Sequence, residues 1–196
     1  MPAWLGTGDS VATQIFALVL GAVVGSFLNV CIWRIPQGES VVYPPSHCPH
    51  CGQRLKAWQM IPILSYLLLR GRCAFCSQTI GWIYPTVEAL GALSLWGAMV
   101  RFGPTWSALG VACLIWIGLV VAFIDLYHYR IPDSVTITGM VLGIMFTLAR
   151  NLEGAAELGP VAWRTLEQCF YGAVAGGGFL WLVGFLSRGG MGGGDI

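Results

Sequence analysis

The sequence contains few charged residues. Lys, Arg, Asp and Glu make up 10% of its 196 residues, whereas an average soluble domain contains about 25%. This scarcity excludes an ordinary water-soluble globule. The formal net charge of +1 excludes a polybasic nucleic-acid binder or an acidic tail, and the lack of polar low-complexity tracts excludes extended disorder. We therefore expect no nucleic-acid partner.

Apolar and small residues are abundant instead. Hydrophobic residues make up 56% of the chain and aromatic residues 12%, and 27 residues are glycine. Such a composition is typical of helices that contact lipid on the outside and pack closely through small residues inside. The sequence predicts an all-α fold, a polytopic transmembrane helical bundle surrounded by the lipid bilayer.

Five apolar stretches approach the length of about 20 helical residues that a bilayer core about 30 Å thick requires. They cover residues 11–32, 83–100, 106–124, 135–148 and 166–186. The fourth is short and contains Thr136, Thr138 and Gly139, so we expect neighbouring helices to shelter it from lipid. The first runs on into polar residues without a small-residue cleavage site, so we expect it to remain as a spanning helix.

The loop cations predict the orientation, because cationic loops resist translocation and stay cytoplasmic. With five crossings, one set of loops contains seven cations and the other contains three. The larger set is Arg34, Arg54, Lys56, Arg70, Arg72, Arg130 and Arg188, and the smaller is Arg101, Arg150 and Arg164. We expect the N-terminus outside, and the loop after the first span, residues 125–133 and Asp195 at the cytoplasmic face.

These features divide the chain into three parts. Residues 1–36 form the first transmembrane helix, residues 37–82 a cytoplasmic loop with four cysteines, and residues 83–196 a transmembrane core. Within the loop, the apolar run 57–69 is interrupted by Pro62 and is too short to cross, which indicates an interfacial or re-entrant segment. We identify no internal repeat.

Four of the seven cysteines form two Cys-x-x-Cys pairs, Cys48 with Cys51 and Cys73 with Cys76. Two such pairs can place four thiolates tetrahedrally around one Zn²⁺, and the filled coordination shell is typical of a structural site. His50, inside the first pair, is an alternative ligand. A redox dithiol formed by the first pair is the competing interpretation, but it leaves the second pair without a function.

Carboxylates in or beside apolar spans need an explanation, because a charge at the centre of a span costs at least about 2.5 kcal/mol. Glu88 lies near the start of the second span, where a role inside the bundle and a pairing with a loop arginine are equally compatible with its position. Asp125 ends an apolar run, with a salt bridge as its alternative role. Asp133 follows Pro132, so it or Ser134 is expected to cap the next helix.

Asp195 ends a glycine-rich stretch, residues 189–194, for which a flexible loop is the alternative interpretation. Asp125 and Asp195 are expected at the same membrane face. Two acids that share a water can hydrolyse a peptide bond, because the ionised one takes a proton from the water while the protonated one polarises the carbonyl.

Several motifs together resemble those of one family, the prepilin peptidases, which are membrane aspartyl proteases also called type IV leader peptidases. They are Gly-Ser-Phe-Leu-Asn-Val at 25–30, the paired Cys-x-x-Cys motifs, Ile-Pro-Ile-Leu-Ser-Tyr at 61–66, Tyr-Pro at 84–85 with Glu88, the stretch 125–133, and Gly-Gly-Gly-Asp at 192–195.

The resemblance implies a bacterial inner-membrane enzyme with Asp125 and Asp195 as its catalytic pair. Such enzymes cleave the basic leader of type IV prepilins or pseudopilins after a glycine, on the cytoplasmic side. Members with a cysteine loop typically also N-methylate the new N-terminus with S-adenosylmethionine. The resemblance and the cysteine spacing together support structural zinc at Cys48, Cys51, Cys73 and Cys76.

One departure from the family concerns the C-terminal end. The family continues beyond its Gly-x-Gly-Asp motif with a lysine and further apolar helices, whereas this chain ends at Ile196. We expect either a fragment or a chain whose remaining spans are supplied in another way. The alternative functions are a membrane thiol-disulfide oxidoreductase that uses Cys48 and Cys51, and a proton-coupled transporter with Asp125 and Glu88 along its path.

Overall fold

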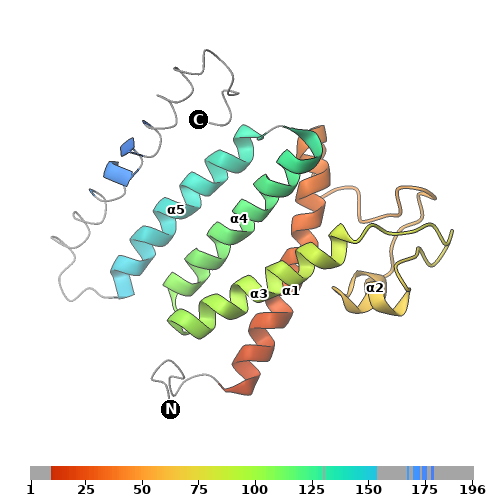
Figure 1. Cartoon of the computed structure of the whole chain (residues 1–196), viewed down its shortest axis with the longest axis horizontal. Coiled ribbons are helices and arrows are strands. Elements are labelled where there is room, and N and C mark those ends of the chain that lie inside the picture. The colour runs from red at the N-terminus through yellow and green to blue at the C-terminus, as the bar shows by residue number, and fades with distance from the viewer. Residues whose placement is uncertain are drawn as a thin grey trace.

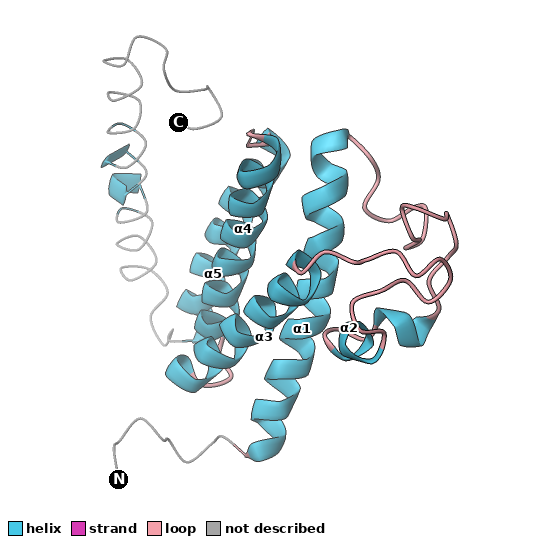
Figure 2. Cartoon of the chain, turned by 45° about the vertical axis from the view of Figure 1, so that its right-hand side comes forward, coloured by secondary structure: helices cyan, strands magenta, loops and turns pink. Residues whose placement is uncertain are grey.

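The computed structural model describes residues 10–129 and 131–153, together with a few residues near the C-terminus. These few are Glu167, Phe170, Tyr171, Gly172, Val174, Ala175 and Gly178. Most of the expected fifth span lies outside the described residues, as does Asp195. Among the described residues, all regular structure is helical (Figure 2). The expectation of an all-α fold is confirmed.

Four long helices form a bundle (Figure 1). They are α1, Val11–Arg34; α3, Ile83–Phe102; α4, Trp106–His128; and α5, Asp133–Glu153. The loop between α1 and α3 contains the short helix α2, Leu64–Leu68, and two 3₁₀ turns, Ile35–Gln37 and Ala57–Met60. Loop residues therefore lie beside one end of α1 and the start of α3.

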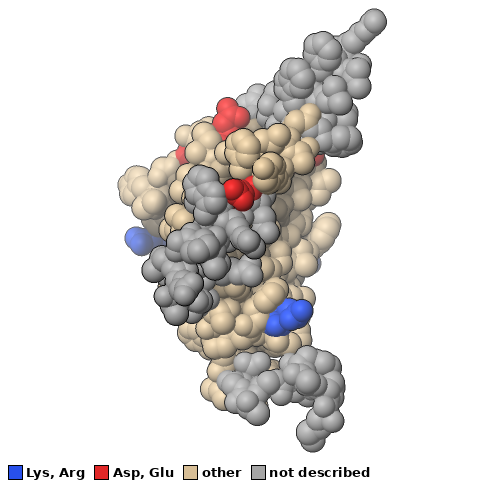
Figure 3. All heavy atoms as spheres, turned by 90° about the vertical axis from the view of Figure 1, so that its left-hand side faces the viewer, with Lys and Arg blue, Asp and Glu red and all other residues tan. Residues whose placement is uncertain are grey.

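Three helices of the described part of the chain, α1, α3 and α4, are long and apolar enough to cross a membrane. The apolar part of α5, Asp133–Ala149, is shorter, in agreement with the weaker fourth span expected from the sequence. On the described part of the face seen in Figure 3, charged side chains are few and lie apart from one another. The chain is a multi-pass membrane protein.

Glycines bring α1 and α3 into backbone contact. A Cβ on Gly91 of α3 would lie 2.7 Å from the carbonyl oxygen of Gly21 and 2.9 Å from Cα of Gly25 on α1. No side chain fits between the helices here. Close approach through two glycines spaced four residues apart is a known mode of helix packing in membranes, and it accounts for part of the high glycine content.

Trp116 adds α4 to this contact. Its Nε1–H donates a 3.2 Å hydrogen bond to the carbonyl oxygen of Gly91, within the buried interior. Trp116 belongs to a core to which all four long helices contribute apolar side chains. Those that are fully or almost fully buried include Ala17, Ile32, Val87, Leu95, Ala112, Val120, Ile124 and Val135. Packing between α1, α3 and α4 thus fixes the position of the helix ends, and the polar residues described below lie there.

Candidate functional site: a four-cysteine cluster and the exposed end of α4

The four paired cysteines meet in the loop between α1 and α3. The Sγ atoms of Cys48, Cys51, Cys73 and Cys76 all lie within 4.8 Å of one another, and those of Cys48 and Cys76 are 3.9 Å apart. Four sulfurs at about 2.3 Å from one Zn²⁺ in a tetrahedron are about 3.8 Å apart. The cluster therefore has the dimensions to hold a metal ion, as the spacing predicts.

The two cysteine pairs are built as a structural repeat of 25 residues. The N–H of Cys48 donates to the carbonyl of Gln53, and the N–H of Cys73 donates to that of Gln78, 25 positions later. A short antiparallel bridge closes each turn, His47 with Arg54 in the first and Arg72 with Thr79 in the second. The expectation of no internal repeat is therefore wrong for this loop.

The same repeat explains two backbone positions. Gly52 and Ser77 lie at equivalent places, and both have positive φ angles, +67° and +58°. This conformation suits glycine and costs more for serine. The signal was present in the sequence, since Cys-x-x-Cys is followed by a small residue and then glutamine in both copies.

Backbone hydrogen bonds lower the pKa of one thiol of the cluster. The N–H groups of Cys76 and Phe75 point at Cys73, and these hydrogen bonds lower the pKa of Cys73 to about 7. The backbone of Gln78 favours the thiolate form of Cys76, but desolvation and the neighbouring sulfurs outweigh it and raise the pKa of Cys76 to about 11. Such crowding of thiols is relieved when a cation neutralises the thiolates.

Glu88 connects α3 to the loop. Its side chain is buried, and its Oε2 accepts a 2.6 Å hydrogen bond from the main-chain N–H of Ile63. Ser26 of α1 interacts with the same carboxylate. Among the described residues, no arginine pairs with Glu88, so its role inside the bundle is the one that the geometry supports.

Ile63 itself has a strained backbone. Its φ is +61° and its ψ is −49°, and the N–H of Leu64 donates to the carbonyl of Pro62 across it at 2.5 Å. This is a γ-turn of the rare, strained form, and a β-branched residue is unfavourable there. The hydrogen bond to Glu88 is one of the interactions that hold this turn.

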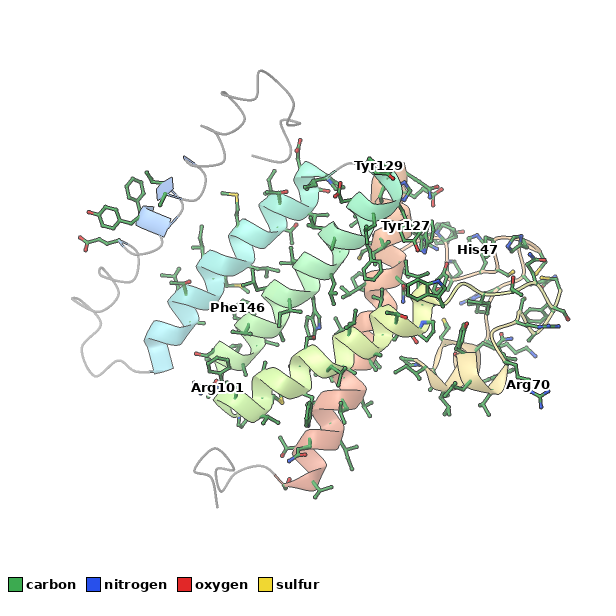
Figure 4. The ribbon with its side chains drawn as sticks, in the orientation of Figure 1. His47, Arg70, Arg101, Tyr127, Tyr129 and Phe146 are labelled. Atoms are coloured by element: carbon green, nitrogen blue, oxygen red, sulfur yellow. The ribbon has the colours of Figure 1, made fainter. Side chains whose placement is uncertain are left out.

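Asp125 lies in the last turn of α4, with its side chain exposed. Its main-chain carbonyl accepts from the N–H of Tyr129, which ends the helix in a left-handed conformation with φ +50°. Within the described residues, no side chain pairs with the Asp125 carboxylate, so a salt bridge to His128 is not formed. Arg130 lies outside the described residues. Figure 4 shows Tyr127 and Tyr129 at this end of the bundle, and Arg101 at the opposite end.

Aromatic residues join the end of α1 to the end of α4. The ring centroid of Trp33 lies 5.6 Å from that of Tyr127 and 6.1 Å from that of His128. These contacts fix the turn of α4 that carries Asp125. The position of Trp33 was not predictable from the sequence, because one tryptophan among nine gives no signal of this packing.

Buried polar atoms gather at the same end. Asn29 donates from Nδ2 to the carbonyl of Tyr84 at 3.1 Å. Its Oδ1, together with Nε1 of Trp33 and Nε2 of His128, is buried without a hydrogen-bond partner in the part of the chain that the structure describes. Water is the usual partner of such atoms.

The structure places Asp133 differently from the expected cap. Helix α5 begins at Asp133 itself, and the carbonyl of Pro132 accepts the first hydrogen bond, from the N–H of Val135 at 3.0 Å. Asp133 is thus a residue of the first turn, where its negative charge interacts favourably with the positive end of the helix dipole. Asp195 lies outside the described residues, so its predicted meeting with Asp125 stays a prediction.

Comparison with known proteins assigns the chain to a family. The model of the bacterial peptidase A24 N-terminal domain matches residues 19–102, and that of the type IV leader peptidase family matches residues 112–196. The first match contains the cysteine loop, and the second contains both Asp125 and Asp195. No solved structure matches the chain.

Curated relatives carry the printed name prepilin leader peptidase/N-methyltransferase. The protein of Stutzerimonas stutzeri is 36% identical over 96% of this chain and 71% of its own length. That of Burkholderia pseudomallei is 38% identical over 95% of this chain and 64% of its own length. That of Myxococcus xanthus is 37% identical over 88% and 54%. The chain belongs to the type IV leader peptidase family, and it spans only part of the length of these relatives.

Proposed function

We propose that the protein is a prepilin peptidase that cleaves the leader of type IV prepilins or pseudopilins after a glycine and N-methylates the new N-terminus. The observation that carries the proposal is the family match over both halves of the chain, with relatives named for both activities. The exposed, unpaired carboxylate of Asp125 at the end of α4 supports it within the described residues.

The proposed hydrolysis uses Asp125 and Asp195 as a pair. The ionised acid takes a proton from a water molecule, whose oxygen forms a bond to the carbonyl carbon of the scissile peptide, while the protonated acid donates to the carbonyl oxygen. The C–N bond then breaks, its nitrogen receives the proton that the first acid took from the water, and the carbonyl oxygen returns its proton to the second acid as the C=O bond re-forms. The buried polar atoms of Asn29, Trp33 and His128 favour water near this end of the bundle.

Zinc in this proposal has a structural role. Cys48, Cys51, Cys73 and Cys76 would hold the ion, which would crosslink the two turns of the loop and occupy all four thiolates, so that no position is left for substrate. The convergence of both pairs also favours metal over a redox site, which needs a single dithiol.

For methyl transfer, we propose S-adenosylmethionine as the methyl donor, on the strength of the relatives' printed name. The methyl group passes from the donor's sulfonium to the free amine that cleavage creates, and the amine loses a proton. Cleavage must therefore precede methylation, because the peptide nitrogen is not nucleophilic before the bond breaks.

We place the enzyme in a bacterial inner membrane, with Asp125 and the cysteine loop at the cytoplasmic face. The distribution of seven and three cations between the two loop sets supports this side. Within the described residues, the end of α4 and the loop lie at the same end of the bundle, away from Arg101 (Figure 4).

One assay tests both activities. The chain is reconstituted in lipid and incubated with a precursor peptide that has a Gly-Phe junction and with a labelled methyl donor, and cleavage and methylation are scored separately. We expect cleavage after glycine, followed by labelling of the new phenylalanine terminus. Cleavage without labelling would reduce the proposal to a peptidase, and labelling of uncleaved peptide would contradict the order of steps.

A further inference from the structure

An apolar segment of the loop is exposed beside the bundle. Residues 57–69, which include the second 3₁₀ turn and α2, expose six large apolar side chains by between 44% and 66% of their surface. These are Trp58, Met60, Ile61, Leu64, Leu67 and Leu68. A cluster of this size on a loop marks a contact with a partner or with lipid.

Cations flank this segment, and the stretch around it, residues 40–87, contains no acid. Between Glu39 and Glu88 the sequence contains neither Asp nor Glu. Its four Lys and Arg residues lie immediately before and after the segment: Arg54, Lys56, Arg70 and Arg72, all of them exposed. Figure 4 shows Arg70 at the outer edge of α2, on the side away from the bundle.

The segment is attached to the side of the bundle. The hydrogen bond from Ile63 to Glu88 fixes its middle against α3, about one turn into a helix that can cross the membrane. In Figures 1 and 2, α2 lies crosswise to α1. An apolar helix that lies in the plane of a membrane, next to helices that cross it, has this arrangement.

We propose that residues 57–69 form an in-plane anchor that inserts its apolar side chains at the boundary between headgroups and acyl chains, and that its flanking cations bind anionic phospholipid. The apolar side chains supply the depth of insertion, and the four cations supply the preference for negative headgroups. The anchor fixes the cysteine cluster at the membrane surface, on the same side as Asp125.

Charge complementarity favours lipid over a second copy of the chain. Two copies facing each other through this segment would bring eight cations together, four from each copy, and residues 40–87 of neither copy contain an acid to compensate. An anionic leaflet offers many negative groups beside an apolar layer, and it matches both features of the segment at once.

Photocrosslinking in vesicles tests this proposal without reference to catalysis. A photoreactive phenylalanine analogue replaces Leu67 in the full chain, which is reconstituted in phosphatidylcholine with or without phosphatidylglycerol. The same analogue at Leu93, 53% exposed on α3, is the control for a position on a spanning helix, and at Phe75, 45% exposed between Cys73 and Cys76, it is the control for a loop position outside the segment. Mass spectrometry identifies the adducts.

We expect phospholipid adducts at position 67 at a yield similar to that at position 93, and about tenfold fewer at position 75. Phosphatidylglycerol should be enriched among the adducts at position 67 relative to its share of the vesicles, and Lys56→Gln with Arg70→Gln, which removes two of the four cations, should lower that enrichment. Adducts at position 93 but not at 67 would overturn the anchor. Protein–protein adducts at 67 would assign the segment to a second copy instead. Lipid adducts at 67 without enrichment would overturn the preference for anionic lipid.

Discussion

The main-chain N–H of Ile63 donates a 2.6 Å hydrogen bond to Oε2 of Glu88. This contact joins a strained turn of the loop to a buried carboxylate of α3, and through Ser26 the same carboxylate interacts with α1. Glu88, which belongs to the Tyr-Pro motif at 84–85, therefore has a structural role. It holds the cysteine loop at the end of the bundle where Asp125 lies.

Removal of this acceptor should loosen the loop. Glu88→Ala leaves the Ile63 N–H without its partner, at a cost of about 1–3 kcal/mol, and releases the strained turn. Limited proteolysis in detergent should cut between residues 57 and 69 faster than in the wild type. Glu88→Gln keeps an acceptor oxygen and is the matched control, with cutting close to the wild-type rate. Equal proteolysis rates for Glu88→Ala and the wild type would show that this hydrogen bond does not hold the loop in place.

Backbone contact between α1 and α3 predicts a difference between two glycines of α3. A Cβ at Gly91 would lie 2.7 Å from backbone oxygen, whereas a Cβ at Gly97 would meet nothing within 4 Å. Gly91→Ala should destabilise the protein by about 1–3 kcal/mol, as overpacking does. Gly97→Ala should leave stability unchanged or slightly raised. Thermal unfolding in one detergent compares the two, and a similar effect at both positions would contradict the close crossing.

The cysteine cluster predicts about one tightly held Zn²⁺ per chain. Cys73→Ser removes one of its four thiolates and should lower the zinc content measured on the purified protein, with methyl transfer more sensitive than cleavage. Cys113→Ser, in α4 and outside the cluster, should keep the zinc. Full zinc content after replacement of all four clustered cysteines would contradict the assignment of the zinc site to this cluster. A reversible disulfide between Cys48 and Cys51 would favour the redox alternative.

Sidedness can be measured with introduced cysteines. Lys56 and Pro104 are both exposed, the first in the cysteine loop and the second between α3 and α4. A membrane-impermeant thiol reagent added to intact cells should label Pro104→Cys but reach Lys56→Cys only after the membrane is opened. The reverse pattern would invert the topology and place Asp125 on the side away from a cytoplasmic substrate.

The sequence predicted the long helices well, because an apolar run of sufficient length must satisfy its backbone as a helix in lipid. The expected span at 106–124 is part of α4, Trp106–His128. The helix extends one turn further because backbone hydrogen bonding continues past the point where apolar residues end. Asp125 lies in this last turn, at the end of the helix, as the apolar run that it terminates predicts.

The cysteine cluster was also predictable, since metal-ligand spacing is local information. The partner of Glu88 was not. The acceptor role of Glu88 depends on where a turn 25 residues earlier lies in space. Every residue except proline has a backbone N–H, so the sequence does not indicate which one donates. The contact of Trp33 with Tyr127 and His128 was hidden for the same reason, because it joins helices about 90 residues apart in the chain.

Cleavage by aspartate variants tests the central claim most directly. Asp125→Asn and Asp195→Asn, each in a membrane-inserted chain with its zinc content intact, should abolish cleavage of a precursor with a Gly-Phe junction. The double variant should be scarcely worse than either single one, because residues that act as a unit do not contribute additively. Asp133→Asn, in the first turn of α5, is the matched control and should retain most of the rate. Near wild-type cleavage by Asp125→Asn would contradict the aspartyl mechanism.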